Sequence, residues 1–189
     1  MDASVTLDFS ARPAPPISNG RLGMMLLIGT ETILFSCFIG AYLVLRMGAA
    51  VWPLSGTPVL TLGLSAINTV LLVFSSALAI GFRTAARRGL LERSHRLMTA
   101  AWISGALFLG LQALEFHRLY ARGLTLQTGA YGALFYSLIT CHGLHVLGGL
   151  AIFGYTLRSL TPERAGHAEL YWHFVTGIWL VLFAILYLL

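Results

Sequence analysis

The residues that could carry chemistry lie inside long apolar stretches. Glu31 stands about a third of the way along the run from Gly23 to Arg46, and most of the remaining side chains of that run are apolar. A carboxylate at that depth is costly unless it is paired, protonated or turned toward protein. We therefore expect Glu31 to be a protonated or hydrogen-bonded carboxyl within a helix bundle.

Two histidines form the second unusual feature. His142 and His145 are three residues apart in the segment TCHGLHVLGGL, so their imidazoles share one face of a helix. Such a pair could ligate a metal or haem, or it could form hydrogen bonds between helices. Because the apolar runs offer no further ligands, we favour hydrogen bonding and expect this chain to bind no metal.

A third polar pair lies near the end of the apolar run at residues 97–119. Gln112 and Glu115 are three residues apart and share a helical face. An ion pair between Glu115 and either Arg118 or Arg122 at the membrane interface is the simpler interpretation.

The last apolar run opens with Glu169, Tyr171, Trp172 and His173. Aromatic residues at the start of a span usually belong to the interfacial belt. Glu169 and His173 are four residues apart and could pair on one face. With nearby arginines, this cluster could bind a lipid headgroup, or it could only set the depth of the helix.

These residues must be positioned by membrane helices. The chain has 189 residues, of which 57% are hydrophobic and 10% charged, and its mean hydropathy is +0.80, far above that of soluble domains. Runs long enough to cross a bilayer occupy residues 22–45, 58–82, 97–119, 130–157 and 170–189. The sequence therefore predicts an all-α bundle of five transmembrane helices over residues 21–189, preceded by a flexible tail over residues 1–20 that contains no signal peptide.

The arginines indicate the orientation. All twelve basic residues are arginines, and they lie between or at the ends of the apolar runs, which excludes a soluble nucleic-acid-binding surface. Nine of them fall in the tail and the second and fourth loops, and three on the opposite side. By the positive-inside rule, the N-terminus is expected in the cytoplasm and the C-terminus outside.

Small polar residues recur on two helical faces, where they favour close helix packing. One face carries Thr61, Ser65, Asn68 and Ser75, and the other carries Thr32, Ser36 and Gly40. The two cysteines, Cys37 and Cys141, form no metal-binding or redox spacing and are interpreted as packing residues.

Five segments in order resemble subunit III of haem-copper terminal oxidases, here in its five-helix form. They read GMMLLIGTETILFSCFIGAYLVLR, INTVLLVFSSALAI, LQALEF, YGALFYSLITCHGLHVLGGL and YWHFVTGIWLVLFAILYLL. The HGLHVLGG and YWHF motifs are the specific ones. The resemblance covers nearly all of residues 21–189.

The resemblance implies several residue roles. Glu31 would be the buried, carbodiimide-reactive glutamate of the family. A two-helix arm formed by the first two spans and a three-helix arm formed by the last three would enclose a phospholipid cleft. The family's recurrent polar positions would be occupied by Glu115, His142, His145, Tyr171, Trp172 and His173. Together with Glu169, these residues are expected to serve intramembrane packing or to line the lipid cleft. Two positions depart from the family pattern: Thr176 replaces an acid, which removes any carboxylate role there, and Phe116 replaces a tyrosine.

The resemblance also implies a non-catalytic subunit of an aerobic respiratory oxidase in the bacterial inner membrane. Its partners would be the catalytic subunit I and subunit II, which hold the haems and copper, and membrane phospholipids. Membership of a respiratory supercomplex stays open. The chain would stabilise subunit I, support proton uptake and give oxygen access through the lipid cleft. We favour cytochrome c over quinol as the electron donor of the complex.

Two alternative functions remain open at this point. Accessory membrane proteins of nitric oxide reductase resemble subunit III and have a similar length. A small proton-coupled transporter could use Glu31 and the histidine pair as a relay. The five spans show no inverted repeat and no broken helix, which argues against a transporter.

Overall fold

The computed structural model describes residues 18–52, 60 and 62–189, and these residues form five long helices and a short terminal turn. The elements are α1 (Asn19–Gly48), α2 (Leu62–Arg87), α3 (Leu91–Ala121), α4 (Gly129–Arg158), α5 (Pro162–Phe183) and the π-helix η1 (Ala184–Leu188). Five helices are long and apolar enough to cross a membrane, which confirms the predicted all-helical membrane architecture. Most of the expected tail lies outside the described residues.

Local signals explain where helices begin and end. The Ser18 side chain accepts a hydrogen bond from the Arg21 backbone N–H and caps α1. Thr161 caps α5 in the same way, and Pro162 occupies its first turn. These caps start α5 eight residues before the apolar run that the sequence indicates, because its first two turns are polar.

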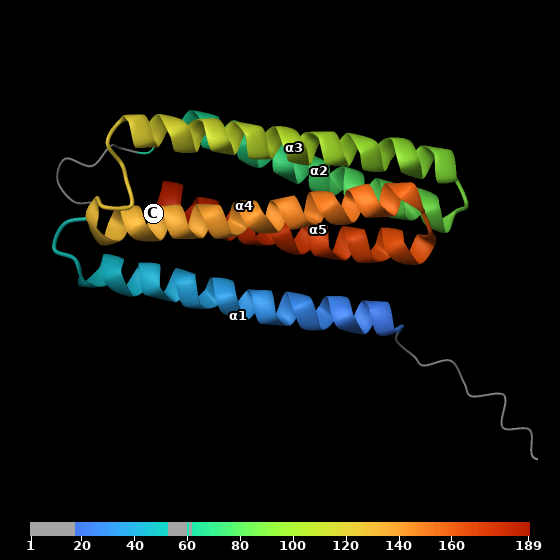
Figure 1. Cartoon of the computed structure of the whole chain (residues 1–189), viewed down its shortest axis with the longest axis horizontal. Coiled ribbons are helices and arrows are strands. Elements are labelled where there is room, and N and C mark those ends of the chain that lie inside the picture. Colours follow the sequence, from blue (N-terminus) through green and yellow to red (C-terminus); the bar gives the residue numbers. More distant parts are fainter. Residues whose placement is uncertain (1–17, 53–59, 61) are drawn as a thin grey trace, which may run out of the picture.

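Successive helices run in opposite directions, so alternate connections between them lie at the same end of the bundle (Figure 1). One end, here called the arginine-rich end, holds the start of α1, the α2–α3 and α4–α5 connections, and most arginines. The α2–α3 connection turns at Gly89, whose φ of 74° suits glycine. Nearby, the Ser94 hydroxyl donates to the Phe82 carbonyl at 2.7 Å and ties the two helices together.

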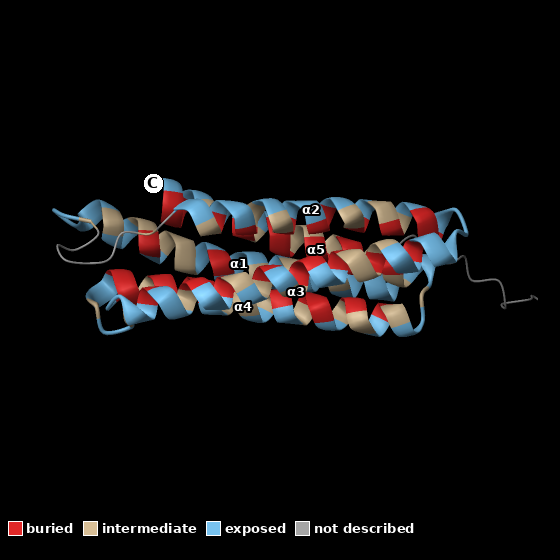
Figure 2. Ribbon diagram, turned by 90° about the horizontal axis from the view of Figure 1, so that it is seen from above, coloured by how far each residue is buried: buried red, intermediate tan, exposed pale blue. Residues whose placement is uncertain are grey.

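Helices α2, α3, α4 and α5 form the body of the bundle, and α1 packs on its α4–α5 side (Figure 1). The expected arm formed by the first two spans is therefore wrong. Helix α2 packs mainly against α3 and α5, because its small and polar face fits theirs closely. Buried residues line the interior of the bundle, whereas most of α1 stays exposed (Figure 2).

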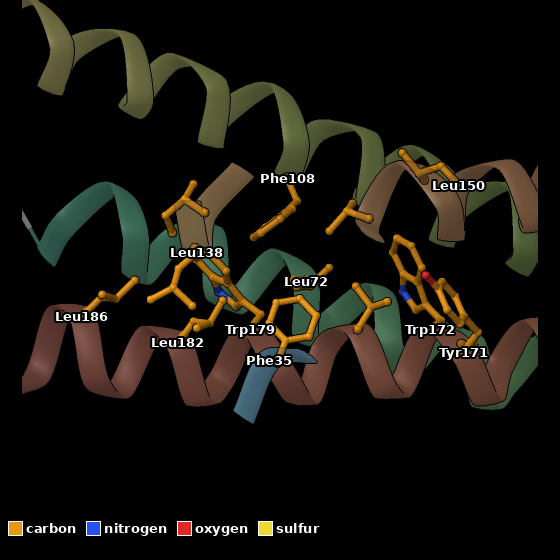
Figure 3. Packing of buried hydrophobic residues seen from close by; sticks show 14 of the residues in the cluster. Phe35, Leu72, Phe108, Leu138, Leu150, Tyr171, Trp172, Trp179, Leu182 and Leu186 are labelled. Carbon is orange, nitrogen blue, oxygen red and sulfur yellow. The ribbon is translucent and has the colours of Figure 1, made fainter. Parts of the chain in front are cut away.

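Trp172 lies at the centre of the packing in the half of the bundle nearest the arginine-rich end. Its ring lies so close to Gly105 of α3 and Gly149 of α4 that an added Cβ would approach it within 2.6 and 2.7 Å. Its indole N–H donates to Ser75 of α2 at 3.1 Å. One side chain of α5 thus contacts three other helices, and the close-up in Figure 3 shows it beside Tyr171 and Leu150.

Two packing expectations need correction. The face of α1 with Thr32 and Ser36 is exposed, and each hydroxyl donates to the carbonyl four residues earlier in its own helix. Cys37 is also exposed. The reason is that α1 has neighbours on one side only, so its opposite side meets no other described helix.

Candidate functional site

The centre of the site is a short hydrogen bond between α1 and α4. The Glu31 carboxylate oxygen Oε2 lies 2.6 Å from His145 Nε2. The two side chains are 22% and 13% exposed, so the pair lies just beneath the surface of the bundle. The sequence predicted a protonated or hydrogen-bonded carboxyl at Glu31 and hydrogen bonds between helices for the histidine pair, and the structure brings Glu31 and His145 together.

The hydrogen bond at the second ring nitrogen of His145 limits the protonation states that the pair can adopt. His145 Nδ1 lies 2.6 Å from the carbonyl oxygen of Cys141, one turn earlier in α4. Because a carbonyl oxygen only accepts, Nδ1 must be the donor. Nε2 therefore either accepts a hydrogen bond from a neutral Glu31 or, in the imidazolium form, donates a hydrogen bond to the Glu31 carboxylate. The pair holds one proton across a short bond in both cases, which suits proton storage or transfer.

Phe35 closes the site from α1. Its ring meets the His145 ring edge-on, with the centroids 4.9 Å apart. Phe35 is 1% exposed and belongs to the continuous core. One turn after Glu31, it thus fixes the height of α1 against α4 and holds the carboxyl opposite the imidazole.

His142 does not join this pair. It is 1% exposed, and both ring nitrogens lack a hydrogen-bond partner among the described residues. Its ring is tilted against Trp179 at 5.2 Å and meets Phe35 and Phe108 edge-on. His142 therefore acts as an aromatic packing group between four helices. No cluster of three potential metal ligands occurs in the described part of the chain.

A second polar cluster joins α2 to α5 at the arginine-rich end. Arg83 Nη1 donates to Glu169 Oε2 at 2.5 Å, and the Glu169 side chain is 8% exposed. His173 Nε2 lies 3.6 Å from the other carboxylate oxygen, and its Nδ1 lies 2.5 Å from the Ser76 hydroxyl. The predicted Glu169–His173 proximity is present, and Arg83 supplies the cation that the buried carboxylate requires.

Sequence reasoning missed Arg83 and Ser76, although a spacing signal exists. Thr69, Ser76 and Arg83 are seven residues apart, which places them on one face of α2. All three meet α5: Thr69 accepts from the Trp179 indole at 2.9 Å, and the other two contact His173 and Glu169.

The aromatic residues at the start of α5 lie deeper than an interfacial belt. Trp172 is fully buried and Tyr171 is 6% exposed. The interfacial interpretation is wrong for these two residues because α5 begins earlier than the apolar run indicates, which moves them into the bundle.

Glu115 also differs from the simpler expectation. Its carboxyl accepts from the Ser65 hydroxyl of α2 at 2.6 Å, and its neighbour Gln112 accepts from the Asn68 amide at 3.0 Å. Glu115 is 2% exposed and forms no ion pair with Arg118 or Arg122 in the described structure. The predicted α2 face of small polar residues accordingly lies against α3; its first member, Thr61, lies outside the described residues.

The comparisons with known proteins agree with this arrangement. A family model described as cytochrome c oxidase subunit III matches residues 8–189. Cytochrome c oxidase subunit 3 of Thermostichus vulcanus is 37% identical over 89% of this chain and 86% of its own length. The subunit 3 of Alkalihalophilus pseudofirmus is 35% identical over 90% and 87%.

A relative with another electron donor in its name is also similar. Subunit 3 of the cytochrome bo(3) ubiquinol oxidase of Pseudomonas putida is 32% identical over 89% of this chain and 84% of its own length. The family model matches almost the whole chain, and the relatives align with it over most of their length, so this protein belongs to the cytochrome c oxidase subunit III family.

Proposed function

We propose that this chain is the non-catalytic third subunit of a proton-pumping haem-copper oxidase in a bacterial inner membrane. It packs beside the catalytic subunit I, together with subunit II, and keeps subunit I active during turnover. The haems and copper belong to those partners. The chain itself supports proton uptake at the arginine-rich end, which faces the cytoplasm, and gives oxygen a path through bound lipid.

The observation that carries this proposal is the Glu31–His145 pair. A carboxyl and an imidazole 2.6 Å apart share one proton in the membrane interior. The pair lies at the edge of the bundle, with the Glu31 side chain 22% exposed, so a neighbouring subunit or a lipid can reach it. Protonation at this position would change the charge beside the partner without any chemistry in this chain.

Phospholipid binding is the second part of the proposal. A hollow of about 290 Å³ opens at the arginine-rich end between α1, α2 and α5. Its polar lining includes Arg21, Arg83, Arg87, Glu163 and His167. Arg83 is already paired with Glu169, so Arg21 and Arg87 are the guanidinium groups that favour an anionic phosphate headgroup in this hollow. The acyl chains of the lipid would follow the exposed sides of α1 and α2.

The central experiment replaces Glu31 by Gln in the intact oxidase. The variant keeps the shape and one hydrogen bond to His145 but cannot hold the shared proton. We expect assembly to persist, carbodiimide labelling of this chain to be lost, and the enzyme to inactivate within fewer turnovers. Glu92→Gln, which changes an exposed acid at the start of α3, is the matched control and should behave as wild type. Unchanged labelling and unchanged turnover-linked inactivation in Glu31→Gln would refute the role.

Gentle detergent purification tests the partners. We expect a tagged chain to carry along a haem-containing subunit I and a subunit II that binds copper. Copurification of a nitric oxide reductase instead, or of no redox subunit, would contradict the proposal. The haem spectrum of the same sample then identifies the type of oxidase.

A further inference from the structure

A third polar cluster lies in the half of the bundle opposite the arginine-rich end, apart from Glu31. It joins α2 to α3 through two hydrogen-bonded pairs of side chains, Ser65 with Glu115 and Asn68 with Gln112. All four side chains are at most 5% exposed. The proposed oxidase role does not use them, so the inference below is independent of that role.

Tyr187 of η1 completes the cluster. It is 9% exposed, and its hydroxyl faces Glu115, Ser65 and Gln112 without reaching hydrogen-bond geometry with another described residue. The π-helical turn Ala184–Leu188 makes this possible, because its extra residue per turn keeps the last side chains of the segment inward. Single π turns of this kind often occur at functional sites.

Several buried polar atoms around Tyr187 lack a partner in the described structure. They are Glu115 Oε2, Gln112 Nε2, Asn68 Oδ1 and the tyrosine hydroxyl. Buried polar groups are almost always satisfied by protein or by ordered water. Polar groups that face one another without a direct hydrogen bond between them are the usual setting of a bridging water.

We propose that Glu115, Gln112 and Tyr187 form an internal water-binding site in which Glu115 is a neutral acid. One water molecule bridges Glu115 Oε2, Gln112 Nε2 and the Tyr187 hydroxyl. It accepts from the Gln112 amide and from the protonated Glu115 Oε2, and it donates to the Tyr187 hydroxyl oxygen, so each of the three atoms gains a partner. The site thereby fastens η1 to α2 and α3.

The charge balance of the site requires the neutral form. No arginine or histidine nitrogen of the described residues lies within salt-bridge distance of Glu115. A buried carboxylate without a cation is unfavourable, whereas the acid form donates one hydrogen bond and accepts others. The Glu169 carboxylate, which has Arg83 beside it, shows the contrasting solution within the same protein.

The first test is infrared spectroscopy of the assembled protein in its membrane. We expect a carbonyl stretch of a neutral carboxylic acid that disappears in Glu115→Gln and shifts in heavy water. Tyr187→Phe should shift the same band, because it removes the hydroxyl that the water bridges while leaving the ring in place. Glu163→Gln, which changes a solvent-exposed acid, should leave the band unaltered.

The second test is a high-resolution density map of the unaltered protein. We expect a water peak within hydrogen-bond distance of at least two of the three named atoms, and its loss in Tyr187→Phe. Density showing a direct Tyr187–Glu115 hydrogen bond and no water would overturn the water site. A carboxylate band in place of the acid band would overturn the neutral Glu115. Both readouts stand whether or not the chain belongs to an oxidase.

Discussion

At the scale of single residues, each buried acid is stabilised differently. Glu31 is hydrogen-bonded to His145, Glu169 pairs with Arg83, and Glu115 accepts from Ser65. The partner decides the chemistry. Glu31 has an imidazole as its direct partner at 2.6 Å, whereas Glu169 is paired with Arg83 and its neighbouring histidine lies 3.6 Å away. Because an imidazole can both accept and donate a proton, Glu31 is the acid best placed to exchange one with its partner.

Replacing His145 by Leu tests the coupling. The variant leaves Glu31 without its partner, and we expect a loss of about 1–3 kcal/mol in the free energy of unfolding. The double variant Glu31→Gln with His145→Leu should lose less than the sum of the single variants, because the acid that needs the imidazole is then absent. Denaturation of the four forms in detergent measures this coupling. His95→Leu, which changes an exposed histidine, is the control, and strict additivity would contradict a specific pair.

At the scale of helices, close approach depends on glycine beside tryptophan. Gly105 and Gly149 let Trp172 lie between α3 and α4, where its indole also reaches α2. The spacing of small residues in the sequence favours close packing, but it does not identify the ring that fills the space.

The variant Gly149→Ala tests this contact. The added Cβ would come within 2.7 Å of the Trp172 ring, and we expect a destabilisation of about 1–3 kcal/mol from overpacking. Gly154→Ala on the same helix meets nothing within 4 Å and should be neutral or stabilise by up to about 1 kcal/mol. Thermal unfolding of both variants gives the comparison, and equal effects would refute the close contact.

At the scale of the whole molecule, charge is distributed unequally between the two ends. The arginine-rich end carries most of the basic residues that the structure describes, while Arg46, Arg118 and Arg122 lie at the other end. There the Arg46 guanidinium donates to the Leu189 carbonyl and joins α1 to the end of η1. This asymmetry predicts one orientation in the membrane.

Cysteine labelling tests that orientation. In a background with Cys37 and Cys141 replaced by Ala, a single Arg88→Cys in the α2–α3 turn should react with a membrane-impermeant maleimide only after the membrane is opened. Arg122→Cys, at the opposite end, should react in intact cells. The reverse pattern would show that the arginine count gives the wrong orientation.

The sequence by itself determined which segments of this protein form membrane helices. Apolar runs broken by polar turns fix five membrane helices, because each run must satisfy its backbone hydrogen bonds internally in lipid. The sequence also identified isolated polar residues within those runs, such as Glu31 and His145, because a polar side chain inside an apolar run is costly to bury.

The tertiary structure alone decided which helices meet. Helical periodicity says which residues share a face, but it contains no information on the partner helix. It could not show that Glu31 reaches His145 in place of His142, that Glu115 bonds to α2 and not to an interfacial arginine, or that α1 lies against α4 and α5. Those pairings depend on the fit of side chains far apart in the chain, such as Trp172 over two glycines, and only packing in three dimensions selects them.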